Sequence, residues 1–270
     1  MSTEPEPVPA RAAPILEVER IGKRFGGLTA LSDVTFTIGE GEIYGLIGPN
    51  GAGKTTLFNV LTGIYHQDEG TLRFRGAALR VPTPDRIAKL GIARTFQNIR
   101  LFANLSALEN VMIGRHVRTR AGVVGAILRD RRTRSEEAAI ERRAHELLRY
   151  VGIARRANEL ARHLSYGDQR RLEIARALAT DPRLLALDEP AAGMNATEKV
   201  ELRKLLEAIR ADGITLLIIE HDVRLVMGLC DRVLVLDYGR KIAEGVPKAI
   251  QKDPAVIAAY LGKPRAEAEA

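Results

Sequence analysis

The sequence predicts an α/β fold that joins an antiparallel, strand-rich N-terminal part, a core of buried parallel strands and an inserted helical segment. Three observations support this prediction. Residues 15–38 alternate apolar and polar side chains, as half-exposed strands do. Short apolar runs at 42–47, 184–187 and 214–219 are typical of strands buried on both faces. Between the first two of these runs, from about residue 98 to 175, apolar residues recur at helical spacing.

The N-terminal part begins with two predicted strands, 15–21 and 31–38, separated by a turn at 24–27 that carries Phe25. A third alternating stretch follows at 70–76. Alternation of this kind is typical of antiparallel sheets with one face exposed to water. We therefore expect these strands to form an antiparallel sheet beside the parallel core.

The middle of the chain contains three pairs of residues with the spacing of a capping box, in which an N-cap hydroxyl precedes an acid by three residues. Apolar residues follow each pair at helical intervals, so we expect each pair to start a helix with one face in the core. The pairs are Ser106 and Glu109, Thr133 and Glu136, and Ser165 and Asp168.

The C-terminal third returns to the parallel pattern. The strand at 184–187 ends in two acids, a helical face over 202–209 ends at Gly213, and a buried strand follows at 214–219. Residues 233–243 are predicted to form a hairpin about a turn at 237–240.

The composition is that of a globular protein with a sizeable core, since 46% of the 270 residues are apolar and 28% are charged. The single cysteine, Cys230, fits a reducing compartment and is expected to pack rather than react. Residues 1–14, which lack the apolar stretch of a signal peptide, are expected to be a disordered tail, and 263–270 a second tail. No run approaches the roughly 20 apolar residues that span a bilayer.

The net charge of +7 suggests a polyanionic partner. Nucleic acid, an anionic membrane surface and a merely solvated surface are all compatible with it. Seven arginines lie between residues 115 and 134, but no aromatic residue among them could stack on bases. The charge alone therefore does not choose a partner.

A glycine-rich stretch matches the phosphate-binding pattern G-x-x-x-x-G-K-[ST] without a gap. Between a predicted strand and a predicted helix that ends at Gly63, it has the context that this motif requires. Backbone N–H groups can wrap an anion at the helix N-terminus, Lys54 would contact the β- and γ-phosphates, and Thr55 would ligate Mg²⁺. We therefore predict a nucleoside triphosphate site rather than a turn that binds nothing. The stretch consists of Gly48, Pro49, Asn50, Gly51, Ala52, Gly53, Lys54 and Thr55, followed by Thr56.

Polar residues follow two of the predicted parallel strands. Asp188 and Glu189 end the strand at 184–187, at the edge where parallel sheets place their ligands. Asp188 is predicted to hold Mg²⁺ and Glu189 to act as the general base toward the attacking water. His221 follows the strand at 214–219 and is suited to contact the γ-phosphate.

Residues 164–171 offer a second anion site, although the chain has only one phosphate loop. Ser165 supplies a hydroxyl, Gly167 an unencumbered backbone, and the helix that follows supplies its N-terminus. With this segment the sequence resembles the ATP-binding cassette (ABC) ATPases over nearly all of residues 16–262. In that family the signature segment completes the ATP site of a facing subunit, so Ser165 and Gly167 are expected to contact a partner's ATP.

The resemblance implies an α/β, P-loop (RecA-like) ATP-binding core at 15–97 and 176–262, with an inserted helical subdomain at 98–175. It matches Gln97 to the Q-loop glutamine, which implies that Gln97 senses Mg²⁺ and reports to a membrane partner. It also matches His221 to the switch histidine and implies catalytic roles for Glu189, His221, Gln97 and Lys54.

Phe25 lies where the family has an adenine-stacking aromatic residue, usually a tyrosine. The sequence departs from the common L-S-G-G-Q signature at Tyr166 and Asp168, and Asn195 replaces the usual aspartate of the D-loop. Because Ser165 and Gly167 are kept, we expect hydrolysis to survive these changes.

Four stretches look more narrowly like the longer ATPase subunit of bacterial branched-chain amino acid importers. This resemblance implies ATP and Mg²⁺ as cofactors and a second ABC ATPase subunit, in a homo- or heterodimer, as partner. It further implies integral membrane permeases, a periplasmic solute-binding protein as an indirect partner, and a peripheral location on the cytoplasmic face of the inner membrane. The stretches are 95–102, 164–167, 188–195 and 259–262.

Three alternatives stay open at this point. Another ABC transporter, for urea or amide import or for lipopolysaccharide export, would use the same ATPase motifs. A non-transport ABC ATPase acting on nucleic acid would suit the positive charge, but the chain has neither long coiled coils nor tandem cassettes, so no nucleic acid is expected. A P-loop kinase would not explain residues 164–171.

Overall fold

The computed structural model describes residues 13–80, 83–118 and 131–261, and the described strands form two sheets. The larger sheet has the order β10-β9-β3-β8-β7-β6; β10 is antiparallel to β9, and the other neighbours are parallel. The smaller sheet is antiparallel, with the order β2-β1-β4-β5. The larger sheet contains β3 (Ile43–Ile47), β6 (Ile92–Arg94), β7 (Leu184–Asp188), β8 (Thr215–Ile219), β9 (Arg232–Asp237) and β10 (Arg240–Gly245). The smaller contains β1 (Pro14–Phe25), β2 (Leu28–Gly39), β4 (Glu69–Phe74) and β5 (Ala77–Ala78).

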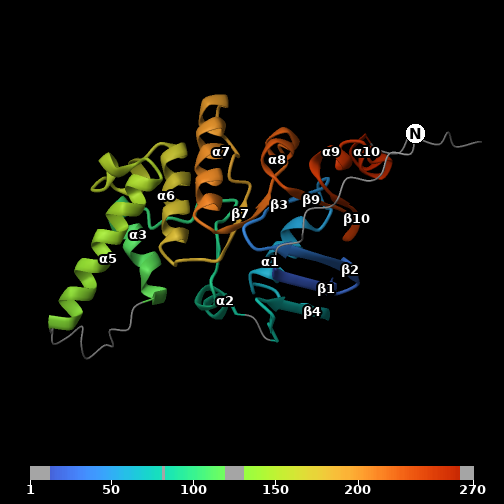
Figure 1. Cartoon of the computed structure of the whole chain (residues 1–270), viewed down its shortest axis with the longest axis horizontal. Helices are drawn as coiled ribbons and strands as arrows, with labels where there is room; N and C mark the ends of the chain where they lie inside the picture. The colour runs from blue at the N-terminus through green and yellow to red at the C-terminus, as the bar shows by residue number, and fades with distance from the viewer. Residues whose placement is uncertain (1–12, 81–82, 119–130, 262–270) are drawn as a thin grey trace, which may run out of the picture.

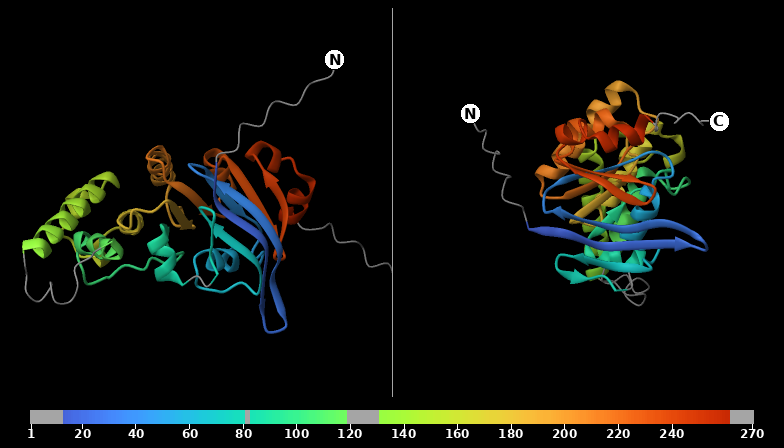
Figure 2. Two further views of the ribbon diagram at one scale, coloured as in Figure 1. Left: turned by 60° about the horizontal axis from the view of Figure 1, so that its bottom comes forward. Right: turned by 90° about the vertical axis from the view of Figure 1, so that its right-hand side faces the viewer.

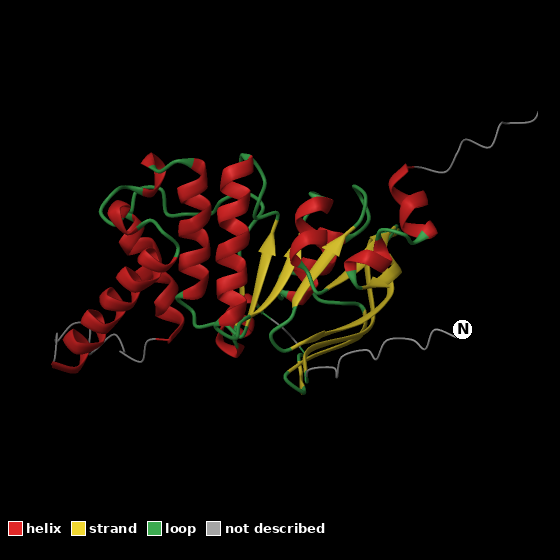
Figure 3. Ribbon diagram, turned by 45° about the horizontal axis from the view of Figure 1, so that its top comes forward, coloured by secondary structure: helices red, strands yellow, loops and turns green. Residues whose placement is uncertain are grey.

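The helices α3, α5 and α6 lie together at one end of the molecule, away from the antiparallel strands (Figures 1 and 3). Figure 2 shows the antiparallel strands β1 and β2 as a long ribbon that extends beyond the sheet core. This arrangement confirms the predicted α/β core with N-terminal antiparallel strands and added helices. The helices are α1 (Lys54–Leu61), α2 (Pro84–Leu90), α3 (Ala107–Arg115), α5 (Arg131–Tyr150), α6 (Tyr166–Leu178), α7 (Ala196–Ala211), α8 (Val223–Leu229), α9 (Pro247–Ile250) and α10 (Pro254–Leu261), with single 3₁₀ turns at His116–Arg118, Ala154–Arg156 and Ala161–His163.

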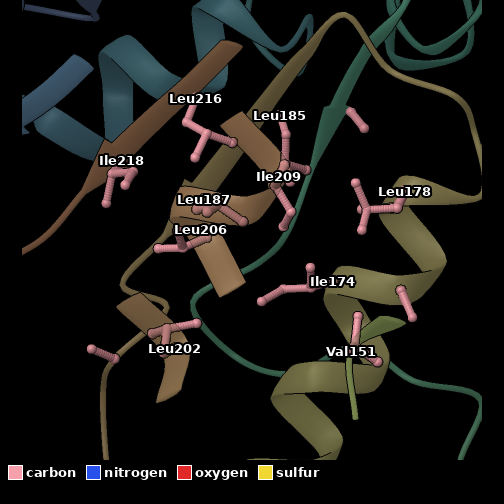
Figure 4. Close-up of a cluster of buried hydrophobic side chains, with 14 of the residues drawn as sticks. Val151, Ile174, Leu178, Leu185, Leu187, Leu202, Leu206, Ile209, Leu216 and Ile218 are labelled. Atoms are coloured by element: carbon pink, nitrogen blue, oxygen red, sulfur yellow. The ribbon is translucent and has the colours of Figure 1, made fainter. Parts of the chain in front are cut away.

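The parallel sheet is buried on both faces, which explains its unbroken apolar strands. Successive side chains of a strand point to opposite faces, so Leu185 and Leu187 of β7 face one core while Leu184 and Ala186 face the other. The first core is filled by α6, α7 and α8, and Figure 4 shows α7 packed on β7 and β8 through its apolar face. The second core holds α1 between the parallel and the antiparallel sheet.

Two of the three predicted helix starts are confirmed. Ser106 forms a complete capping box with Glu109, and Ser165 accepts a hydrogen bond from the backbone N–H of Asp168 at 3.2 Å. The prediction for Thr133 is wrong, because α5 already begins at Arg131. Arginine is a good helix former, so the basic residues before Thr133 extend the helix past the predicted cap.

The carboxyl ends of the parallel strands meet at one edge of the sheet, as in other open α/β sheets. The phosphate loop follows β3, Gln97 follows β6 by three residues, Asp188 ends β7, and His221 follows β8. Four segments that are far apart in sequence therefore converge at this edge.

Several sequence predictions fall wholly or partly outside the described residues. The predicted tails at 1–14 and 263–270 lie outside them, except that Ala13 is described and β1 already begins at Pro14. The arginine-rich segment is described only up to 118 and from 131 onward. In the described part of the chain, no helix is long and apolar enough to cross a bilayer. The division at residues 97/98 and 175/176 stays a prediction.

Cys230 is buried, as predicted, against the strand that leads into the phosphate loop. A Cβ atom built at Gly45 would lie 3.0 Å from its sulfur, so Gly45 leaves the space that the thiol fills. Burial raises the pKa of the Cys230 thiol to about 12, which keeps it protonated and unreactive near neutral pH.

Leu206→Ala should lower the free energy of unfolding by about 2–5 kcal/mol, because it opens a cavity between α7 and the sheet where Leu206 is fully buried. Val200→Ala in the same helix is the matched control, since Val200 is 53% exposed and its truncation leaves no cavity. Urea unfolding of both variants measures the difference; equal losses would show that α7 does not pack as described.

Candidate functional site

At two positions, the loop between β3 and α1 has a backbone conformation that only glycine can adopt. Gly48 has φ 152°, and a Cβ atom there would lie 2.2 Å from the carbonyl oxygen of Leu236. Gly53, at φ 97°, would place a Cβ atom 2.8 Å from the carbonyl oxygen of Ala30. The loop is therefore held against the β9–β10 turn and the start of β2. Its backbone N–H groups lie immediately before the N-terminus of α1 in the chain.

A cleft of about 470 Å³ opens over this loop. Gln97, Glu189 and Phe25 all border it. Its dimensions are those of a small-molecule site. The lining residues are Phe25, Leu28, Thr29, Ala30, Asn50, Gly51, Ala52, Gly53, Lys54, Thr55, Thr56, Gln97, Glu189, Tyr238 and Gly239.

Phe25 is 42% exposed and presents its ring to the cleft, while Tyr65 meets that ring edge-on with centroids 5.2 Å apart. The ammonium of Lys23 lies 5.4 Å from the same ring centroid. A ring supported in this way offers a face on which a planar aromatic group can stack.

Lys54 is directed onto the loop. Its ammonium donates hydrogen bonds to the carbonyl oxygens of Gly48 and Pro49, at 2.7 and 2.9 Å. Partial burial lowers the pKa of Lys54, whereas the carboxylates of Glu189 and Asp188 raise it. The cation therefore sits between the phosphate loop and the two acids.

Asp188 is the buried acid of the pair, with 4% of its surface exposed. The pKa of its carboxyl is raised to about 6, mainly because burial disfavours the charged form; Arg94 opposes this rise, and the charge of Glu189 contributes to it. The backbone N–H of Asp188 donates to the hydroxyl of Thr95 at 3.3 Å. A carboxylate in such a site gains from a cation placed beside it.

Glu189 is the acid that faces the cleft. Its Oε2 accepts a hydrogen bond from the amide of Gln97 at 3.2 Å, and Nδ1 of His221 lies 3.5 Å from the same oxygen. Glu189 has φ 48°, a left-handed conformation that is uncommon for a residue with a side chain. The N–H of Glu189 donates to the carbonyl of Ile219 at 2.9 Å, which holds this conformation.

Ser165 and Gly167 lie apart from this cleft. They line a separate pocket of about 90 Å³ with Glu198, at the N-terminus of α6. Ser165 is exposed, but Gly167 is buried, and a Cβ atom built on it would lie 2.9 Å from Oε1 of Glu198. The expectation of an unencumbered backbone at Gly167 is therefore wrong for the chain as described, because the side chain that caps α7 also covers this glycine.

Asn195, which stands where the D-loop of the family usually has an aspartate, still caps the helix α7. The Asn195 side chain accepts the N–H of Glu198 at 3.0 Å, and Glu198 accepts the N–H of Asn195 at 2.9 Å. Asparagine caps a helix as well as aspartate does, so the start of α7 is retained.

Sequence reasoning missed four residues that shape the site. Glu220, fully buried, accepts the N–H groups of Ala191, His221 and Asp222 and so holds the loops after β7 and β8 together. Gly239 donates to the carbonyl of Ala52 at 3.0 Å and supports the phosphate loop. The other two, Arg170 and Glu173, lie on α6. Only Glu220 had a sequence signal, because it stands beside His221 after a buried strand.

Comparison with known proteins agrees with this geometry. The family model described as ABC transporter matches residues 31–192, and the model described as branched-chain amino acid ATP-binding cassette transporter matches residues 240–266. The chain belongs to the ABC transporter ATP-binding family. This ATP-binding cassette thus matches the family's nucleotide-binding core and, near its C-terminus, the model for branched-chain amino acid cassettes.

The cassette resembles its relatives along nearly its whole length. It is 44% identical over 93% of its length to the high-affinity branched-chain amino acid transport ATP-binding protein LivG of Salmonella typhimurium, covering 98% of that protein. It is 43% identical, with the same coverage, to the corresponding protein BraF of Pseudomonas aeruginosa. Among solved structures, the ADP conformation of the cassette MJ1267 matches with a TM-score of 0.81 and 32% identity, over 93% of this chain and all of the other.

Asp188→Asn should raise the free energy of unfolding at pH 7.5, by up to about 3 kcal/mol, in the absence of nucleotide. The pKa of Asp188 rises from its ordinary 3.8 to about 6 in the fold, so the folded state loses stability as the pH rises through this range and the carboxyl ionises. Denaturant titrations at pH 7.5 and pH 4 measure the effect. The gain should shrink at pH 4, and a variant less stable than wild type at pH 7.5 would contradict the assignment.

Proposed function

We propose that the cassette binds and hydrolyses ATP to drive solute import through membrane permeases. The observation that carries this proposal is the contact of Gln97 and His221 with one oxygen of Glu189, beside the phosphate loop. Three separate loops thereby bring polar groups together beside the phosphate loop, and we expect the γ-phosphate to lie next to them. Glu189 is suited to accept a proton from the attacking water there.

The same residues suit Mg²⁺. Thr55, Gln97 and Asp188 all offer oxygen ligands, which this cation prefers, and burial of Asp188 favours a cation beside it. Bound Mg²⁺ would neutralise charge on the phosphates. Lys54 would contact the β- and γ-phosphates, the loop N–H groups at 48–55 would hold the same groups, and Phe25 would stack on the adenine.

We propose that two cassettes share each ATP site. Ser165 and Gly167 line a pocket separate from the phosphate-loop cleft, so a second copy or a related cassette would supply them. For the facing copy's phosphate to reach Gly167, the Glu198 side chain must move. A dimeric bacterial ABC transporter cassette, 26% identical with a TM-score of 0.74, supports this arrangement.

The transported solute is proposed from the relatives. The names of the relatives at 43–44% identity include high-affinity branched-chain amino acid transport, and we assign branched-chain or other hydrophobic amino acids to this cassette. A periplasmic solute-binding protein would deliver them, so the cassette would act at the cytoplasmic face of the inner membrane.

The permeases are proposed to contact an open groove of about 530 Å³ beside the Gln97 loop. Ile87, Phe96 and Phe102 give it an apolar lining, and Arg94, Arg100 and Arg176 add positive charge. An apolar segment carrying a carboxylate would be complementary to this groove.

Glu189→Gln should lower the rate of ATP hydrolysis by about 10²–10⁴-fold while ATP binding is retained, because the amide keeps the shape of the carboxylate but is not a base. With hydrolysis blocked, ATP should hold the cassettes as a stable dimer. Phosphate release measures turnover, and analytical ultracentrifugation with ATP measures the dimer.

Lys54→Ala is the comparison for this variant. It removes the cation between the loop and the acids, so both ATP binding and turnover should be lost and no dimer should form. Hydrolysis by Glu189→Gln at the wild-type rate would refute the base assignment.

In proteoliposomes that contain the cassette, its permeases and the binding protein, ATP should drive uptake of radiolabelled leucine. Glu189→Gln should abolish uptake, since transport requires turnover. Urea supplied with its own binding protein is the control solute. Uptake of urea but not leucine would assign the cassette to an amide importer instead.

A further inference from the structure

Arg170 is a buried arginine on α6 that holds the loop carrying Gln97. Only 2% of its surface is exposed. Its Nη1 donates to the carbonyl of Phe96 at 2.7 Å, and its Nη2 donates to the carbonyl of Gln97. Glu173, one turn further along α6, accepts the N–H of Phe96 at 3.2 Å. Two side chains of one helix thus fix the backbone on both sides of Phe96.

The same guanidinium contacts the signature segment. Nη2 of Arg170 donates to the hydroxyl of Tyr166 at 3.1 Å, and Nη1 donates to Glu173 at 3.2 Å. The two Nη groups carry four hydrogens, and these contacts account for all four. Arg170 therefore cannot follow a movement of Tyr166 without disturbing its bond to the carbonyl of Gln97.

Tyr166 also touches the D-loop, which comprises residues 192–195. A Cβ atom built at Gly193 would lie 3.0 Å from Cε1 of the Tyr166 ring. Gly193 has φ 72°, a conformation that suits glycine, and its missing side chain leaves room for the ring. Tyr166 is nevertheless 45% exposed, next to Ser165 at the N-terminus of α6. One tyrosine thus joins the signature segment, the D-loop and, through Arg170, the Gln97 loop.

We propose that Tyr166 and Arg170 are positioning residues that couple the two ATP sites of the dimer. This inference rests on the proposed function, in which the signature segment of one copy faces the ATP of the other. When that ATP engages Ser165, Tyr166 shifts with the N-terminus of α6, and Arg170 transmits the shift to Gln97 in its own copy. Gln97 contacts Glu189, so the water-activating acid of one site responds to nucleotide bound at the other.

Tyr166→Phe tests this coupling with a minimal change. The ring against Gly193 is kept, and only the hydroxyl that accepts from Arg170 is removed. We expect the ATP dissociation constant of the single chain to stay within about twofold, the turnover number to fall about tenfold, and the Hill coefficient for ATP to fall toward 1. Tyr150→Phe is the matched control, because it removes a hydroxyl bonded to Asp212 at 2.7 Å on the distant helix α5.

Mixed dimers distinguish coupling from direct contact with nucleotide. One copy carries Glu189→Gln, so only the phosphate-loop site of the other copy turns over. Tyr166→Phe is then placed in either copy, with differently tagged chains purified as a pair. The proposal expects the loss when Tyr166→Phe is in the copy that hydrolyses, although its signature segment faces the inactive site.

The outcomes separate the two levels of the proposal. A loss only when Tyr166→Phe is in the inactive copy would mean direct contact with the ATP it faces and would overturn the coupling. Wild-type turnover and Hill coefficient in the homodimer would overturn it as well, as would a fall in turnover that matches a fall in melting temperature with an unchanged Hill coefficient. If the wild-type dimer, with no substitution in either copy, does not hydrolyse ATP, the proposed function itself fails, and this inference fails with it.

Discussion

The burial of β3 between β8 and β9 is the constraint on which the rest of the structure depends. With apolar helices on one face and α1 with the antiparallel sheet on the other, the strand has a fixed register with both neighbours. The loop that follows β3 must then turn sharply beside Leu236, which only glycine permits. The position of the phosphate site is thus a consequence of packing, and the other polar loops reach the same edge because their strands are parallel to β3.

Electrostatics at this edge follows from the same packing. Asp188 is at the end of a buried strand, so its carboxyl is poorly solvated, whereas Glu189, one residue later, faces the cleft. Adjacent acids in different environments are suited to different tasks, since one can hold a cation and the other can accept a proton. Glu220 and Arg170, both buried, keep the surrounding loops in place through hydrogen bonds to backbone groups.

The sequence allowed the phosphate loop, the two acids and His221 to be predicted, because each belongs to a local pattern beside a recognisable strand. Gln97 was predicted only through the resemblance to the ABC family, since the short strand β6 that precedes it has no clear sequence signal. The fold class followed from the apolar runs and from the alternation near the N-terminus. Arg170 could not be predicted, since an arginine in an amphipathic helix is normally solvated, and its burial depends on a loop more than 70 residues away. The contact of the Glu198 side chain with Gly167 could not be predicted from a short motif either. The same holds for the start of α5 at Arg131.

The chain's only cysteine gives it a practical property. Because Cys230 is enclosed beside Gly45 and stays protonated, thiol reagents should find no ready target on the native fold. A cysteine introduced on the surface would then carry a fluorophore or spin label alone, with no need to replace the natural residue. Distances across the proposed pair of cassettes can therefore be followed by spectroscopy in a chain that differs from the natural one at a single position.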